Sequence, residues 1–219
     1  MLLVCKASAQ VKVGVEAGVN LSRMVGSSSL PSEKTAKVGG QLGVNVDYEF
    51  KNRWMLMSGL TFVRMQGELE LGENYNGASA GTYTNLTSLM KFPEVQSKIN
   101  YLQVPLTLGY HFRLNERFSV IPSVGAYFAY GFSAGKCDLK VLDGETGEVS
   151  ATQWKPLDGK KERGLDGFRK WDWGAVVGVK AVWNQHYTLS LDYSYGVKKA
   201  LTDYELRNTG FRLSIGYRF

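Results

Sequence analysis

Apolar and polar residues alternate along most of the chain. In the C-terminal segment TGFRLSIGYRF, the residues Phe211, Leu213, Ile215, Tyr217 and Phe219 are separated by polar or small residues. Strict alternation with a period of two predicts a β-strand with one apolar face and one polar face. Because Phe219 continues the apolar face, we expect it to belong to the ordered strand, unlike the frayed polar ends of most soluble domains.

The same alternation predicts eight strands and no amphipathic helix. The third strand is the least regular, because Met55 and Met57 fall on its polar face and Ser58 falls on its apolar face. The predicted strands cover residues 11–25, 36–50, 53–68, 97–112, 117–134, 169–183, 187–197 and 209–219.

Short and long connections between these strands alternate strictly. Tight hairpins are predicted at residues 51–52, 113–116 and 184–186. The long connections cover residues 26–35, 70–96, 135–168 and 198–207. This pattern is typical of antiparallel strands that cross a barrier, with tight turns on one side and free loops on the other.

Alternation alone does not decide which face points inward, since soluble lipocalin-like barrels have the same period with apolar side chains inside. Here the polar face carries mainly Gly, Ser, Thr and Asn, which fit a narrow lumen. Aromatic residues gather where the apolar face meets the short connections, which is typical of a membrane-interface girdle. The predicted girdle consists of Tyr48, Phe50, Trp54, Tyr110, Phe112, Phe118, Trp183, Tyr187, Tyr217 and Phe219.

These observations predict an all-β fold, an eight-stranded antiparallel up-and-down transmembrane β-barrel. Unpaired backbone groups cost several kcal/mol each in lipid, so we expect no open edge and a pairing of the first strand with the last. The short connections are expected in the periplasm and the long ones outside the cell. The expected compartment is the outer membrane of a Gram-negative cell.

Composition and charge remove other classes of protein. The 25 Gly, the five Pro and the 12% aromatic content suit an all-β chain. No apolar stretch approaches the ~20 residues of a membrane-spanning helix. The net charge is +6, but the 26 basic and 20 acidic residues are dispersed along the chain. Without a basic cluster to bind a phosphate backbone, nucleic acid is not an expected partner.

The N-terminal sequence MLLVCKASAQ resembles the end of a signal peptide. Ala7, Ser8 and Ala9 form a small-x-small cleavage signature behind a short apolar segment. We expect residues 1–9 to be the remnant of a signal peptide and residues 10–219 to be the outer-membrane barrel domain. If residues 1–9 are removed, no disulfide between Cys5 and Cys137 can form.

Residues with catalytic potential are sparse. A base-activated Ser needs a His within hydrogen-bond reach, and spacing places no Ser or Asp beside His111, which is predicted to face the lumen, or beside His186, which lies in a turn. The segment DGETGE at 143–148 lacks the twelve-residue spacing of a calcium loop and is better interpreted as turns at the tip of a long hairpin loop. We therefore expect no enzymatic activity, no cofactor and no metal site.

The predicted lumen carries charges of both signs. Because an unpaired buried ion costs several kcal/mol, we expect a packed network of salt bridges there. The alternative is a selective polar channel, although an eight-stranded interior is only just wide enough for side chains. The predicted network consists of Lys12, Glu16, Asp47, Glu49, Asp172, Lys180, Asp192, Arg212 and Arg218.

Four segments of the chain resemble the PorT-like, porin-type family of outer-membrane β-barrel proteins. They are VGVEAGVNLS in the first strand, INYLQVPLTLGY in the fourth, WDWGAVVGV in the sixth and the terminal GFRLSIGYRF. The terminal segment is similar to the outer-membrane insertion signal, which implies that Tyr217 and Phe219 present the strand to the barrel assembly machinery. The resemblance implies a fold and a compartment, but such barrels host many activities.

The favoured function is that of a non-catalytic membrane anchor and interaction scaffold. Its long exposed loops would act in adhesion, in envelope assembly or in a secretion system, with outer-membrane lipid around the barrel and protein partners at the loops. A narrow porin-like channel for small solutes is the alternative. An outer-membrane lipid-modifying enzyme is the third hypothesis.

Overall fold

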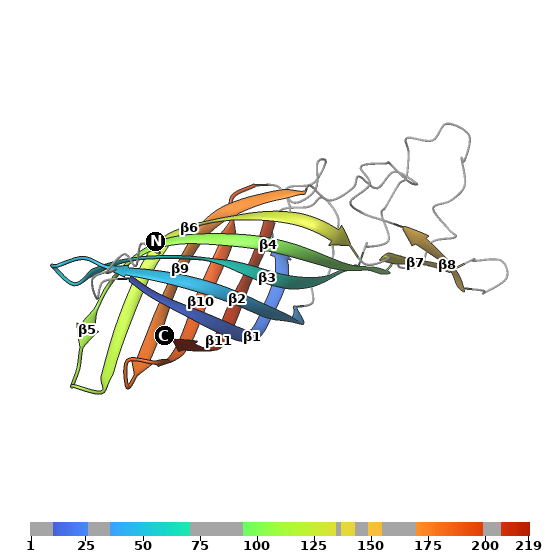
Figure 1. Cartoon of the computed structure of the whole chain (residues 1–219). Helices are drawn as coiled ribbons and strands as arrows, with labels where there is room; N and C mark the ends of the chain where they lie inside the picture. Colours follow the sequence, from blue (N-terminus) through green and yellow to red (C-terminus); the bar gives the residue numbers. More distant parts are fainter. Residues whose placement is uncertain are drawn as a thin grey trace, which may run out of the picture.

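A computed structural model describes residues 11–25, 36–70, 94–134, 137–142, 149–154, 170–198 and 207–219. Eight long strands form the wall of a barrel in this part of the chain (Figure 1). They are β1 (Val11–Val25), β2 (Lys37–Glu49), β3 (Trp54–Glu70), β4 (Glu94–Tyr110), β6 (Phe118–Ala134), β9 (Trp171–Trp183), β10 (Tyr187–Gly196) and β11 (Arg207–Arg218).

The barrel is closed by the pairing of its first and last strands. Each wall strand pairs antiparallel with its neighbours in sequence, β4 pairs with β6, and β1 pairs with both β2 and β11. At the seam, Val19 on β1 lies opposite Leu213 on β11. The prediction of a closed, all-β, eight-stranded antiparallel barrel is confirmed.

Three short strands extend the barrel beyond the eight that the sequence predicts. β5 (Phe112–Arg113) continues the line of β4 after His111 and pairs with β6. β7 (Cys137–Leu142) and β8 (Val149–Trp154) form a hairpin, and β7 also pairs with the start of β4. Figure 1 shows this hairpin projecting at the end opposite to β5. Runs of two or six residues are too short for periodicity to separate a strand from a loop. The predicted turns at 143–148 lie outside the described residues.

The outer wall is apolar. Many of its large hydrophobic side chains are exposed, among them Leu42 at 62%, Ile215 at 68% and Phe219 at 71%. Soluble monomers rarely expose contiguous apolar patches of more than a few hundred Å². A continuous apolar wall around a closed barrel is the arrangement that a hydrocarbon environment requires.

The third strand places its side chains as its irregular pattern predicts. Met55 and Met57 point into the barrel and are 1% and 6% exposed, and they form an apolar cluster with Ile121 and Val182. The Ser58 hydroxyl donates a hydrogen bond of 2.8 Å to the carbonyl oxygen of Pro105 on the neighbouring strand. The lumen near the short turns is therefore filled partly by apolar side chains.

The short turn between β9 and β10 uses residues with left-handed backbone conformations. Asn184 and Gln185 have φ angles of 54° and 66°, and the His186 N–H donates to the carbonyl oxygen of Trp183 at 3.2 Å. Positive φ at both central residues is typical of a type I′ turn, whose twist matches that of the flanking strands. This turn places Trp183 and Tyr187 directly opposite each other on β9 and β10.

The described residues contain no helix that is long and apolar enough to cross a membrane.

Candidate functional site

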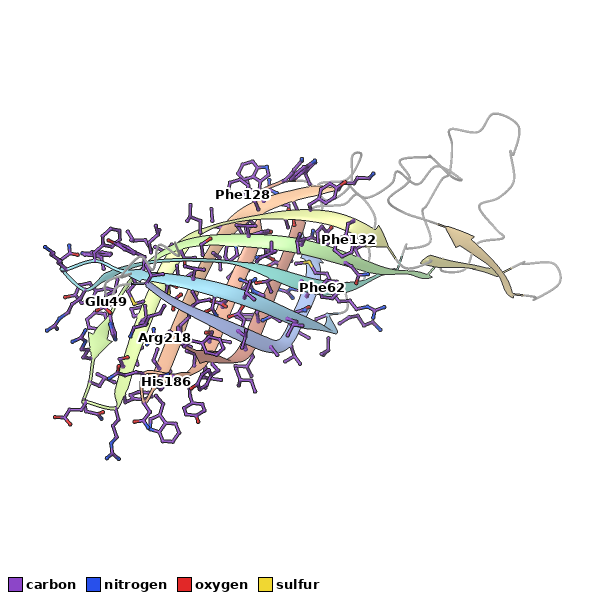
Figure 2. The ribbon with its side chains drawn as sticks, viewed as in Figure 1. Glu49, Phe62, Phe128, Phe132, His186 and Arg218 are labelled. Atoms are coloured by element: carbon purple, nitrogen blue, oxygen red, sulfur yellow. The ribbon has the colours of Figure 1, made fainter. Side chains whose placement is uncertain are left out.

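The candidate site is the interior of the barrel. The nine charged residues predicted for the lumen all occupy inward-facing positions and are buried or half-buried. They lie at three levels, from the short-turn end to the end that carries the long connections. Figure 2 shows Glu49 and Arg218 at the short-turn end, with Phe62 and Phe132 toward the opposite end.

Asp47 holds the central ion pairs near the short-turn end. Its two carboxylate oxygens each accept a hydrogen bond of 3.1 Å from Lys180 Nζ. Arg218 Nη1 lies 3.7 Å from Asp47 Oδ2. The side chains of Asp47 and Arg218 are 1% and 3% exposed, so this carboxylate balances two cations out of contact with water.

Glu49 joins a second group at the mouth of the barrel. Its Oε1 lies 3.0 Å from His111 Nδ1 and accepts a hydrogen bond of 3.1 Å from Arg113 Nη2. His111 is 6% exposed, whereas the side chain of Arg113 is 59% exposed. The pair between Glu49 and His111 was not anticipated, because β3 separates the two strands and register is not visible in a single sequence.

The middle level contains weaker contacts and a small cavity. Arg212 Nη2 lies 4.0 Å from Asp192 Oδ2, and Glu16 Oε2 accepts a hydrogen bond of 3.2 Å from Asn45 Nδ2. A cavity of about 60 Å³ lies among these side chains. Arg212 therefore lies beside Asp192, which is its register partner on the adjacent strand.

The third level, nearer the long connections, is closed around Asp172. Its Oδ2 accepts hydrogen bonds from the Tyr127 hydroxyl at 3.2 Å and from Asn208 Nδ2 at 2.9 Å. Tyr127 and Tyr101 are 1% and 2% exposed. A Cβ added to Gly174 would lie 2.8 Å from Tyr127 Cε1, so the Tyr127 ring packs directly on the backbone of β9.

Sequence reasoning identified Asp172 but missed the side chains that surround it. Tyr101 and Tyr127 lie at inward positions of β4 and β6, but neither was among the residues predicted for the lumen. The aromatic segment GAYFAYGF contains the signal, because alternation places Tyr127 opposite to its neighbours Ala126 and Phe128. A large aromatic residue at an inward position of a narrow barrel fills the lumen.

The aromatic residues predicted for the girdle lie on the outer wall at the short-turn end, and neighbouring rings touch. Ring centroids are 5.5 Å apart between Trp54 and Tyr110 and 5.6 Å apart between Tyr187 and Tyr217. The terminal Phe219 ring contacts the Tyr217 ring at 5.3 Å, and the Phe219 N–H donates to the carbonyl oxygen of Val13 at 2.8 Å.

A second set of aromatic residues, which the sequence analysis did not identify, lies on the outer wall nearer the long connections. Ring contacts join Phe62 to Phe132 at 6.0 Å and Tyr193 to Phe211 at 4.8 Å. The other members with outward exposure are Phe128, Tyr130, Trp171, Trp173 and Tyr195. Two aromatic belts that bracket an apolar wall are the arrangement expected at the two interfaces of a bilayer.

The two histidines are engaged in local contacts. His111 contacts Glu49, and His186 Nδ1 lies 2.8 Å from the carbonyl oxygen of Arg218 while its ring stacks on Tyr217. In the described part of the chain, no group of three or more His, Cys, Asp and Glu side chains is placed to hold a metal ion.

Comparison with solved structures finds similar small barrels. They include Ail, the attachment invasion locus protein of Yersinia pestis (16% identity, 96% of this chain and 99% of that chain, TM-score 0.43). A second example is Neisserial surface protein A, with 15% identity over 94% of this chain and 97% of that chain and a TM-score of 0.45. A third is OprG from Pseudomonas aeruginosa, with 14% identity over 95% of this chain and 94% of that chain and a TM-score of 0.44.

A search of curated protein sequences finds no significant match. A family model described as "Outer membrane protein beta-barrel domain" matches residues 6–202, which is most of the chain. This protein therefore belongs to the outer-membrane β-barrel family, and it lies in the outer membrane.

Proposed function

We propose that the protein is a non-catalytic membrane anchor and interaction scaffold whose lumen does not conduct. The observation that carries the proposal is the filling of the lumen at two separate levels. Tyr101 and Tyr127 fill the level around Asp172, and the cluster of Met55, Met57, Ile121 and Val182 lies beside the Asp47 ion pairs. A barrel filled in this way offers no continuous water path, so its action lies on its outside.

The geometry of the strands supports action through the long connections. Because the wall strands are antiparallel, the four long connections all leave the same end of the barrel. The hairpin of β7 and β8 projects at that end (Figure 1). We propose that these segments lie outside the cell and contact protein partners in adhesion, envelope assembly or secretion.

Current through a planar lipid bilayer tests this proposal. With its lumen filled by its own side chains, the purified folded protein should insert without steady single-channel current. A large-pore porin added to the same bilayer serves as the positive control for insertion and detection. A steady, ion-selective current from the wild-type protein would overturn the proposal and favour the narrow channel.

The narrow channel remains the second candidate because the middle level contains a polar cavity. Its volume of about 60 Å³ has room for several water molecules, since one water needs roughly 10–15 Å³ on this scale. Two of the residues that line it, Gln41 and Arg212, have a buried polar atom (Oε1 and Nε) without a hydrogen-bond partner among the described residues. Water in this cavity would satisfy them, and we propose that the filled levels on either side separate it from both ends.

We also propose that the protein is a PorT-like member of the outer-membrane β-barrel proteins. Its support is the resemblance of the segments in β1, β4, β9 and β11 to that family. We propose further that the barrel assembly machinery recognises Tyr217 and Phe219. The aromatic residues of the outer wall would contact the surrounding outer-membrane lipid.

A further inference from the structure

We propose that the mouth of the barrel at the short-turn end binds a phosphate group. A cleft of about 570 Å³ opens there, at the opposite end from the long connections, so the inference goes beyond the scaffold function. The ionisable side chains that line it are Lys12, His111, Arg113, Glu116, Arg117 and Arg218.

The cleft has more positive charge than its surroundings neutralise. Four of its lining residues are Lys or Arg, and Glu116 is the one carboxylate among them. Beneath the cleft, Glu49 pairs with Arg113, and Asp47 pairs with Lys180 and Arg218. In this group of described residues, five Lys and Arg side chains therefore meet three carboxylates. The two remaining positive charges match the charge of a phosphate dianion.

Two of the cations are available to a ligand. Among the described residues, no carboxylate oxygen lies within 4.0 Å of the Lys12 ammonium or of the Arg117 guanidinium. Arg113 shares Glu49 with His111 and keeps a side chain that is 59% exposed. An oxyanion in the cleft would find several partly hydrated donors within one concave surface.

Arg218 provides a buried donor at the floor of the cleft. The residue is 2% exposed, and its Nε donates to the carbonyl oxygen of Gln185 at 3.1 Å. Its Nη1 is buried, has no hydrogen-bond partner among the described residues and lies 3.7 Å from the nearest Asp47 oxygen. A buried N–H without an acceptor is costly, and the guanidinium fork is well suited to phosphate oxygens.

The phosphate has two possible sources. Arg117 also borders a shallow hollow of about 600 Å³ on the outer wall, which is lined by Asn115, Glu116, Phe118 and Trp183 as well. Phe118 and Trp183 are 36% and 55% exposed and belong to the predicted girdle. The phosphate of a lipid could reach the cleft from this hollow, with the acyl chains of the lipid lying along the aromatic residues. A soluble phosphate would enter through the mouth of the barrel.

Isothermal titration of the full-length barrel in dodecyl maltoside micelles, which contain no phosphate, tests the proposal. One titration uses inorganic phosphate and a second uses the short-chain lipid dihexanoyl phosphatidic acid. We expect wild-type protein to bind the phosphate group and binding to weaken as salt is raised. The double variant Arg113→Gln/Arg117→Gln should bind about tenfold or more weakly, because charge-assisted hydrogen bonds are lost.

Lys51→Gln is the matched control, because Lys51 lies in an exposed turn at the same end and does not line the cleft. Its affinity should equal that of the wild type. Tighter binding of the lipid supports a headgroup ligand, and equal binding of both probes supports a soluble one. The proposal is overturned if neither probe binds, if the double variant binds as the wild type does, or if Lys51→Gln weakens binding as much as the double variant.

Discussion

Replacing Phe219 with Asp should prevent most of the protein from assembling into the outer membrane of living cells. The ring is 71% exposed at the end of the outer wall, where it continues the aromatic row after Tyr217. A charge near the interface costs a barrel only about 0–1 kcal/mol, so the stability of the finished barrel changes little. The large effect is expected during assembly, where the terminal aromatic residues would be recognised.

Two measurements separate assembly from stability. In cells, the amount of folded protein is followed by its heat-dependent migration on gels, and Phe219→Asp should fall to a small fraction of wild type. In purified form, the same variant should still refold into lipid vesicles. Phe112→Asp is the matched control, since Phe112 is a girdle residue at the same end with an exposed fraction of 49%. Normal assembly of Phe219→Asp in cells would contradict a role of Phe219 in assembly.

Replacing Asp47 with Asn should destabilise the barrel by about 3–5 kcal/mol, the cost of leaving a buried ion without its partner. Asp47 is 1% exposed, and its carboxylate is the described counter-ion of both Lys180 and Arg218. Asn preserves the size of the side chain but leaves two cations in the lumen without a compensating charge. Urea unfolding in vesicles, followed by Trp fluorescence, measures the loss.

Two further variants test whether charge is the cause. Glu116→Gln removes a carboxylate from an exposed turn and should change the stability by no more than about 0.5 kcal/mol. Adding Lys180→Met to Asp47→Asn should recover part of the loss, because replacing both members of a buried pair is far less costly than removing one. An Asp47→Asn variant as stable as wild type would show that the Asp47 ion pairs do not stabilise the lumen.

The wall of the barrel was predictable because alternation reports directly which side of a strand each residue faces. In β11 the pattern runs without a break, and its bounds of Arg207–Arg218 lie within two residues of the predicted strand. The short connections then determined the order of the strands. The extra pair β7 and β8 was missed, because six-residue runs inside a long connection carry too little periodicity.

The contacts inside the lumen were not predictable, because they depend on how far each strand is shifted against its neighbour. Asp47 and Lys180 are 133 residues apart in the chain and meet across the lumen. Alternation predicts that both side chains face the lumen, but it does not show that they contact each other. The same limit hid the contact of Tyr127 with Asp172, although an inward aromatic residue on a narrow barrel was visible in the alternation.

Cysteine cross-linking at the seam tests most directly whether the chain closes into the barrel described here. In a chain with Cys5 and Cys137 replaced by Ser, Val19→Cys and Leu213→Cys are directly opposed on β1 and β11. Paired positions fall within the ~4.4–6.8 Å Cα separation that a disulfide spans. Val19→Cys with Leu191→Cys is the control. Leu191 lies on β10, opposite Leu213, and is therefore one strand further from Val19. Oxidation of outer membranes should join positions 19 and 213 and leave 19 and 191 apart. Absence of the first cross-link, or formation of the second, would contradict the closed barrel.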